Sequence, residues 1–172
     1  TPVETTVGSV LAADITVSGK PCRVIAVVPD ANTAYPRTVK GEVGLQQGWE
    51  LARIVRATME EDKDKAEKRA ITALVDVPSQ AYGYREEYNG IFLSCAASVN
   101  AYADARHAGH PVVTFIVGNA ISGAFLAHGL QGSYMLSLDD ETITVHAMSK
   151  KSAARITKRS IADMDDAADK VA

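Results

Sequence analysis

Residues 111–130, PVVTFIVGNAISGAFLAHGL, carry the strongest folding signal in this chain of 172 residues. The run at 112–117 is rich in β-branched residues, which predicts a strand buried on both faces of a sheet. Gly118 is expected to end this strand, and the small residues up to Gly123 are expected to form a tight turn. Residues 124–130 are almost entirely apolar and predict a buried helix. The stretch therefore predicts a strand, a turn and a helix in direct succession.

A strand that turns abruptly into a helix is typical of a site for an oxyanion. The first N–H groups of a helix lack partners within the helix, and the positive end of the helix dipole lies behind them. Gly118 and Gly123 would also let the carbonyl oxygen of a ligand approach the backbone closely. The same residues fit a turn whose small side chains only permit close packing, so this stretch alone leaves both interpretations open.

The flanking sequence predicts one domain over residues 1–172 and leaves open whether residues are missing at the C-terminus. The expected elements are a hairpin over 7–17 and 22–29, a helix over 43–61, a strand over 71–77, a helix over 90–108, two short strands over 134–138 and 142–147 joined by a hairpin turn, and helices from the cap Ser149 to about 159 and over 161–171. This order, with short loops, predicts βαβ units and a mainly parallel sheet, and therefore an α/β fold.

The loops that follow two of these strands should lie close together. They begin after Val77 and Val117, and the carboxyl ends of parallel strands meet at the same edge of a sheet. Ligands of open α/β sheets bind at that edge. This placement favours a binding or catalytic role for the turn at 118–123 over a packing role.

Composition argues against several classes of function. The net charge is −3, with 47% apolar and 23% charged residues, which argues against a general nucleic-acid or membrane-surface binder. No apolar run is long enough for a membrane span, and no signal peptide is expected at the first residues. Cys22 and Cys95 lack metal-ligand spacing, so we expect reduced core cysteines, no metal site and a cytoplasmic location, and the sequence alone leaves a disulfide between them open.

Two segments together resemble the carboxyltransferase branch of the crotonase superfamily, whose members build oxyanion holes from backbone amides at two βα turns. The segments are ITALVDVPSQAYGYREEYNG at 71–90 and PVVTFIVGNAISGAFLAHG at 111–129. They are similar to the carboxyltransferase alpha subunit of acetyl-CoA carboxylase, which typically shows an Asp-x-Pro-Gly-Ala loop and a Gly-Glu-Gly-Gly-Ser-Gly-Gly turn. The chain keeps five residues of that pattern: Asp76, Pro78, Gly118, Ser122 and Gly123.

The departures from that pattern indicate a narrower family. Ser79-Gln80 and Asn119-Ala120-Ile121 stand where the acetyl-CoA carboxylase subunit has more glycine. Together with VVPDANTAYPRTVKGEVGLQQGW at 27–49 and VHAMSKKSAARITKRS at 145–160, they resemble the gamma subunit of malonate decarboxylase. The resemblance covers roughly residues 8–160 and is specific as a whole pattern, not as a single motif. It implies a crotonase-like fold.

The resemblance also implies an activity that the chain has only with a partner. Gamma and beta subunits of malonate decarboxylase form one active site, which decarboxylates a malonyl thioester on an acyl carrier protein to the acetyl thioester. This implies a carboxy-lyase in a hetero-oligomer with a beta subunit and an acyl carrier protein. It implies no cofactor on this chain, since a CoA-derived prosthetic group carries the substrate. A carboxyltransferase subunit of an acyl-CoA carboxylase and a non-catalytic scaffold subunit are the alternatives.

Loss of CO2 from a malonyl thioester places negative charge on the thioester oxygen, and fixed N–H donors aimed at that oxygen lower the barrier. The expected catalytic residues, the first four through their backbone amides, are Gln80 or Ala81 and Ala120 or Ile121, with Ser122 and Gly123. Which amide of each loop donates stays open. Contacts with the substrate or carrier are expected from Tyr82, Gly83, Gly118, Asn119, Lys151 and Arg155.

Two further features allow two interpretations each. His128 could protonate the enolate carbon, although a lone histidine in an apolar helix is more often a hydrogen-bonded core residue. Lys151, Arg155, Lys158 and Arg159 share one helical face. Such a face is typical of a solvated surface, or of a docking site for an acidic carrier or for the phosphates of its arm.

Overall fold

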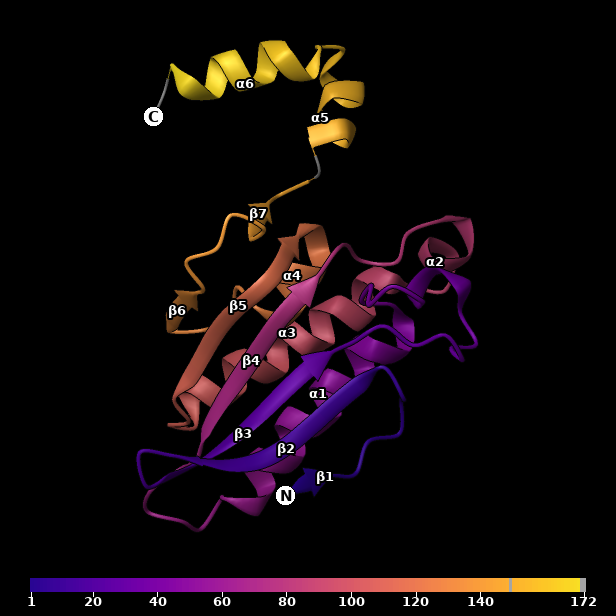
Figure 1. Ribbon diagram of the computed structural model, residues 1–172. Coiled ribbons are helices and arrows are strands. Elements are labelled where there is room, and N and C mark those ends of the chain that lie inside the picture. The colour runs from indigo at the N-terminus through magenta and orange to yellow at the C-terminus, as the bar shows by residue number, and fades with distance from the viewer. Residues whose placement is uncertain (149, 171–172) are drawn as a thin grey trace.

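A seven-stranded, mostly parallel sheet forms the centre of the computed structural model, which describes residues 1–148 and 150–170 (Figure 1). The strands are β1 (Pro2–Val3), β2 (Val10–Val17), β3 (Lys20–Val27), β4 (Ala70–Val77), β5 (Val112–Ile121), β6 (Tyr134–Ser137) and β7 (Thr144–His146). The helices are α1 (Leu45–Glu61), α2 (Tyr84–Tyr88), α3 (Ile91–His107), α4 (Ser122–His128), α5 (Lys150–Thr157) and α6 (Ile161–Asp169), with a 3-10 turn at Pro36–Thr38. The sheet order is β1-β2-β3-β4-β5-β6, and β7 also pairs with β5. The predicted α/β class is confirmed.

The predicted hairpin is confirmed as β2 and β3, which pair antiparallel along their whole length. Ser18 and Gly19 form the turn between them, with φ angles of 50° and 79°. Positive φ at both residues of a two-residue turn matches the twist of the flanking strands.

Two βαβ units follow, β3-α1-β4 and β4-α3-β5, and both helices lie on the same face of the sheet (Figure 1). Right-handed crossovers that advance in one direction along a sheet produce this arrangement. The helices touch closely where Gly48 of α1 faces Ser94 of α3, because a Cβ at position 48 would lie 2.2 Å from Ser94 Oγ. The glycine therefore sets the spacing of the helical layer.

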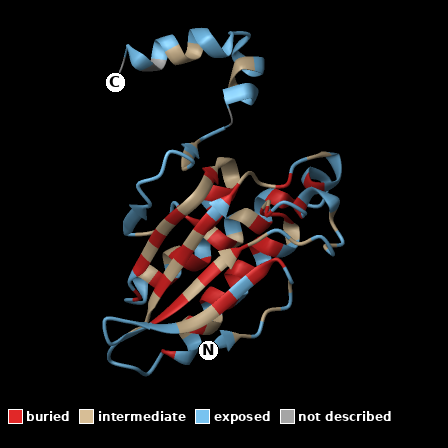
Figure 2. Cartoon of the chain, in the orientation of Figure 1, coloured by how far each residue is buried: buried red, intermediate tan, exposed pale blue. Residues whose placement is uncertain are grey.

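The core lies between the sheet and this helical layer. Side chains of β4 alternate between buried and more exposed positions, and Figure 2 shows the same alternation across the neighbouring strands. The prediction that the strand at 112–117 is buried on both faces is wrong, because its side chains alternate in the same way. These helices cover one face of the sheet, so every second side chain points away from the core.

The central strand is also longer than predicted. β5 continues through Gly118 to Ile121, and α4 begins directly afterwards at Ser122. The extension has a partner on each side, because Ala120 pairs with β4 on one side and with β7 on the other. The predicted tight turn is therefore reduced to a bend at Ser122, whose φ is 63°.

The hairpin predicted for the last two strands is wrong. β6 and β7 both pair in parallel with β5 instead of with each other, β6 along 113–116 and β7 along 119–121. The chain therefore continues along one edge of β5 without reversing its direction. A parallel pairing joins residues far apart in the chain, so a local pattern of turn residues does not reveal it.

The C-terminal helices form an arm that leaves the body of the fold beyond β7 (Figure 1). α5 ends at Thr157, slightly before the predicted end near 159, and Lys158 follows with a φ of 54°. None of the α5 residues is buried. The predicted cap Ser149 and residues 171–172 lie outside the described residues. Among the helices described, none has both the length and the apolar character needed to span a membrane.

Candidate functional site

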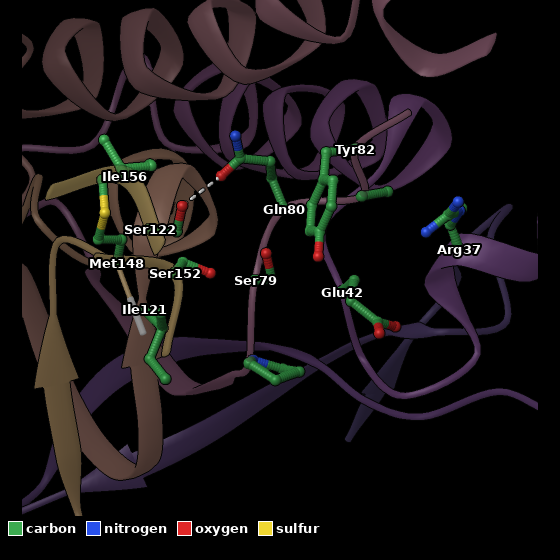
Figure 3. A pocket seen from close by; sticks show the side chains of 12 residues that line it. Arg37, Glu42, Ser79, Gln80, Tyr82, Ile121, Ser122, Met148, Ser152 and Ile156 are labelled. Carbon is green, nitrogen blue, oxygen red and sulfur yellow. Dashed lines mark hydrogen bonds between the residues drawn. The ribbon is translucent and has the colours of Figure 1, made fainter. Parts of the chain in front are cut away.

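The side chain of Gln80 joins the two loops that the sequence predicts to meet. Gln80 lies in the loop after β4, and its Oε1 accepts hydrogen bonds from Ser122 Oγ at 2.8 Å and from the Gly123 N–H at 2.6 Å. Figure 3 shows the bond between the two side chains. Ser122 and Gly123 begin α4. The prediction that the segments following β4 and β5 lie side by side at one edge of the sheet is confirmed.

A cavity of about 400 Å³ opens at this junction (Figure 3). Arg37 and Glu42 lie at one side of it and Ile121 and Ser122 at the other, with Tyr82 between them. The wall comes from the loop after β4, the end of β5, the arm and the segment before α1. The complete lining is Arg37, Glu42, Pro78, Ser79, Gln80, Ala81, Tyr82, Ile121, Ser122, Met148, Ser152 and Ile156.

A second cavity, of about 430 Å³, shares Gln80 and Ser122 with the first. Its wall is mostly apolar and comes from α4, from Leu130 just beyond that helix and from the region of β7. The remaining lining residues are Gly123, Phe125, Leu126, Leu130, Val145, His146 and Ala147. Gln80 and Ser122 therefore border both spaces.

In the first loop, one of the two expected donor amides is already occupied. The Ala81 N–H donates to the Val43 carbonyl at 2.8 Å, and the Val43 N–H donates to the Ser79 carbonyl at 3.1 Å. This parallel bridge directs the N–H of the intervening residue, Gln80, to the opposite side. Within the described part of the chain the Gln80 N–H has no hydrogen-bond partner. It is therefore the amide of this loop that stays available to a ligand.

The expected donor amides of the second loop belong to the end of β5. Ala120 pairs with β4 on one side and with β7 on the other, whereas the pairing described for Ile121 is with β7. Amides of a strand with a neighbour on each side are directed at the carbonyls of those neighbours. Ala120 therefore lies inside the sheet and Ile121 at its end beside the first cavity, and a role of either amide as donor stays a prediction. Beyond the strand, the Gly123 N–H is directed at a side chain, that of Gln80.

Gly118 and Asn119, which were expected to contact the substrate, connect β5 to its neighbours. The Asn119 N–H and Nδ2 donate to Asp76 Oδ1 at 2.8 and 3.1 Å, and Thr144 Oγ1 donates to Asn119 Oδ1 at 2.8 Å. A Cβ at position 118 would lie 2.3 Å from Asp76 Oδ1, so this crossing needs glycine. Neither residue lines either cavity, and both fix the end of β5 instead.

The other expected contact residues divide between the cavity and the surface. Tyr82 lines the first cavity, and the Arg37 guanidinium lies 5.9 Å from the centre of its ring. Gly83 precedes α2 and is not part of the lining. Lys151 and Arg155 lie on α5, the helix that closes one side of the cavity, but both are exposed and outside the lining.

The model of one protein family, described as malonate decarboxylase gamma subunit, matches residues 38–172 and so includes both site loops. The chain belongs to this family.

The relatives of this gamma-subunit chain are longer than the chain itself. Malonyl-S-ACP:biotin-protein carboxyltransferase MADD of Malonomonas rubra is 42% identical over 149 residues, which are 84% of this chain and 51% of the relative. A chain of the Pseudomonas malonate decarboxylase hetero-tetramer in complex with coenzyme A is 49% identical, with a TM-score of 0.95 over 98% of this chain and 64% of that one. A chain of the Pseudomonas MdcD-MdcE hetero-dimer is 52% identical, with a TM-score of 0.85 over 88% of this chain and 59% of that one. The chain thus spans between about half and two thirds of these proteins.

More distant structures show the fold alone. A chain of transcarboxylase 12S is 21% identical with a TM-score of 0.67, covering 87% of this chain and 26% of that one. The predicted crotonase-like fold of carboxyltransferases is confirmed for this gamma-subunit chain.

His128 of this gamma-subunit chain is a core residue. It is fully buried, with Nε2 3.2 Å from the Leu74 carbonyl and Nδ1 3.1 Å from the Tyr102 hydroxyl. A carbonyl can only accept, so Nε2 carries the proton and Nδ1 accepts from the hydroxyl. Burial lowers the pKa of His128 to about 4, and the residue lines neither cavity. His128 is therefore the hydrogen-bonded core residue that the sequence favours, and it is not placed to protonate the enolate carbon.

Sequence reasoning missed several residues of the gamma-subunit site. Arg37, Glu42, Met148 and Ile156 line the first cavity but come from segments remote from the two loops. The segments that contain them, 27–49 and 145–160, carry the family resemblance, but nothing in that pattern singles these four residues out. Only the folded arrangement brings them to the site. Across residues 1–148 and 150–170, no group of His, Cys, Asp or Glu side chains is placed to hold a metal ion.

Proposed function

We propose that this chain, as part of a malonate decarboxylase, stabilises the enolate that forms when a malonyl thioester loses CO2. The observation that carries the proposal is the convergence of two donors, Ser122 Oγ–H and the Gly123 N–H, on one carbonyl oxygen at the cavity wall. That oxygen belongs to Gln80, and in the reaction the thioester oxygen would take its place. Membership of the gamma-subunit family supports the substrate class.

The donors act on the charge that moves during the reaction. Malonyl-S-carrier and a proton become acetyl-S-carrier and CO2, and the electron pair of the breaking C–C bond passes onto the thioester oxygen before the carbon is protonated. Donors fixed in place stabilise that oxyanion more than the neutral carbonyl, and the loss of one donor typically lowers the rate about 10²–10³-fold. The Gln80 N–H, directed away from the Val43 bridge, is the third donor in this proposal.

The walls of the first cavity suit an acyl group on a long arm. Tyr82, Met148 and Ile156 supply apolar surface that helps to exclude water from the enolate. The arm would be the CoA-derived prosthetic group of an acyl carrier protein, with no cofactor resident on this chain. A beta subunit would complete the site and make the chain a carboxy-lyase subunit in a hetero-oligomer. The hetero-dimeric assembly of a similar structure supports this partnership.

Reconstitution tests the proposal. The chain co-purified with a beta subunit should convert malonyl carrier protein to acetyl carrier protein, as measured by mass spectrometry of the carrier and by CO2 release. The chain alone should have no useful rate. Fast turnover by the isolated chain would contradict the dependence on a partner. An assembled but inactive complex would contradict the enolate role.

Carboxyl transfer to biotin is a second candidate, because the relative from Malonomonas rubra is described as a malonyl-S-ACP:biotin-protein carboxyltransferase. Both reactions pass through the same enolate and differ in the fate of CO2. Adding a biotinylated carrier protein to the complex separates them. Formation of carboxybiotin in place of free CO2 would favour the transferase.

The basic side chains of α5 lead to a prediction about carrier docking. Reversing the charge of Lys151 and Arg155 to Glu should raise KM for malonyl carrier protein about fivefold at low salt and leave kcat unchanged, since exposed charge pairs are each worth less than about 1 kcal/mol. The effect should shrink as salt rises, because the attraction is screened beyond about 8 Å at physiological ionic strength. Reversing Lys20 and Lys63, away from the site, provides a control with the same net charge. Equal KM values for the two double variants would show that the basic face of α5 is an ordinary solvated surface and does not bind the carrier.

A further inference from the structure

Gln80 holds an unusual position in the proposed site, because its side chain closes the space that a substrate would need. Gln80 and Ser122 line both a cavity of about 400 Å³ and a second one of about 430 Å³. The first is lined partly by polar and charged groups, such as Arg37 and Glu42, and the second mostly by apolar groups, such as Phe125. The Gln80 side chain therefore borders both spaces.

The hydrogen bonds of Gln80 show what holds it there. Its Oε1 accepts from Ser122 Oγ at 2.8 Å and from the Gly123 N–H at 2.6 Å. The oxygen of a carboxamide is a carbonyl oxygen on a trigonal carbon, and so is the oxygen of a thioester. Both therefore accept hydrogen bonds with similar geometry. The side chain therefore occupies the two donors that the proposed function assigns to the thioester oxygen.

Gly123 makes room for this contact. A Cβ at position 123 would lie 2.6 Å from Gln80 Oε1 and 2.9 Å from its Cδ. Any side chain at that position would displace the carboxamide from the donors. The absence of a side chain at 123 and the carboxamide at 80 thus fit one another.

We propose that the Gln80 side chain is a built-in competitor of the substrate, which occupies the two donors until a thioester oxygen displaces it. This inference rests on the proposed function and adds a regulatory step to it. While the carboxamide is in place the site is not competent to bind, so the apparent affinity for an acyl ligand falls by the fraction of open molecules. The developing enolate is charged and forms stronger hydrogen bonds than a neutral amide, so it holds the donors once it forms.

Titration with malonate as the probe tests this competition. Calorimetry should show malonate binding about tenfold tighter to Gln80→Ala than to the natural chain, since a net intramolecular hydrogen bond corresponds to about that factor. Gln80→Asn keeps a carboxamide but is one methylene shorter, so it should also bind tighter. Gln80→Glu is isosteric and places a carboxylate oxygen on the same donors, so it should bind malonate at least about tenfold more weakly. The titrations should be run on the chain alone and in complex with a beta subunit.

A spectroscopic measurement separates competition from a purely structural role. In the natural chain the side-chain amide resonances of Gln80 should shift when malonate is added, because the carboxamide leaves its two donors. Malonate affinities of Gln80→Ala and Gln80→Asn no tighter than that of the natural chain would overturn the proposal, as would unmoved Gln80 resonances at saturation. Failure of the proposed function would be seen in the activity assay and not in these titrations: the complex of the natural chain with a beta subunit would bind malonate but would not decarboxylate a malonyl thioester.

Discussion

Replacing Ser122 with alanine is expected to lower kcat for malonyl-thioester decarboxylation by about 10²–10³-fold, the usual effect of removing one donor to a developing oxyanion. The Ser122 hydroxyl is one of two donors that converge on the oxygen of Gln80, and alanine removes it without adding bulk. The measurement is steady-state turnover of malonyl carrier protein by the complex with a beta subunit. Because the donor acts mainly on the charged oxygen, kcat should fall more than KM rises.

A glycine variant is the matched control for this change. Ser122 has a φ of 63°, a conformation that is unfavourable for residues with a side chain and readily adopted by glycine. Ser122→Gly therefore removes the same hydroxyl but should melt at a higher temperature than Ser122→Ala. Equal losses of kcat in the two variants would assign the effect to the hydroxyl. If both keep nearly the full rate while still pairing with the beta subunit, the site is a scaffold and not an oxyanion hole.

Acid is expected to destabilise the fold through His128. Its pKa is lowered from 6.5 to about 4 by burial, so the folded chain keeps it neutral while the unfolded chain takes up a proton below pH 6.5. The free energy of unfolding should therefore fall as the pH drops from about 6.5 to about 4. The full shift corresponds to about 3 kcal/mol at 1.36 kcal/mol per pKa unit. Urea unfolding at a series of pH values between 4 and 7.5 measures this change.

Two variants isolate the contribution of His128. His128→Gln cannot take up a proton, so the difference in unfolding free energy between it and the natural chain should narrow by about the same 3 kcal/mol over this pH range. Tyr102→Phe leaves Nδ1 without its donor and should cost about 1–3 kcal/mol at neutral pH. A difference between His128→Gln and the natural chain that does not change with pH would show that His128 titrates normally.

The sequence predicts the parts of this fold that depend on neighbouring residues. The hairpin turn at Ser18 and Gly19 and the two crossover helices are set by local patterns of glycine and apolar spacing, and all are confirmed. The extension of β5 depends on pairing with β7, which lies some 25 positions further along the chain. Residues such as Asn119 have low strand propensity, so the local pattern predicted a turn where long-range pairing makes a strand.

The same distinction applies to the candidate site. Two glycines and a family pattern were enough to predict that the loops after β4 and β5 meet, and Gln80, Ser122 and Gly123 are in contact there. Their role in catalysis stays a prediction. The choice between Gln80 and Ala81 depended on a bridge to Val43, some 37 positions earlier in the chain. A hydrogen-bond direction of this kind follows from the folded pairing and cannot be derived from residue types.

Two parts of the wall of the first cavity differ in how firmly they are anchored. One is the end of β5, which is paired on both edges at Ala120, and another is α5, none of whose residues is buried. Backbone amides of the strand should exchange with solvent deuterium only through global unfolding, and those of the arm through local opening at a small fraction of that free energy. The part of the cavity wall that α5 supplies should therefore move on a faster timescale than the donors at Ser122 and Gly123, which follow directly on the paired strand.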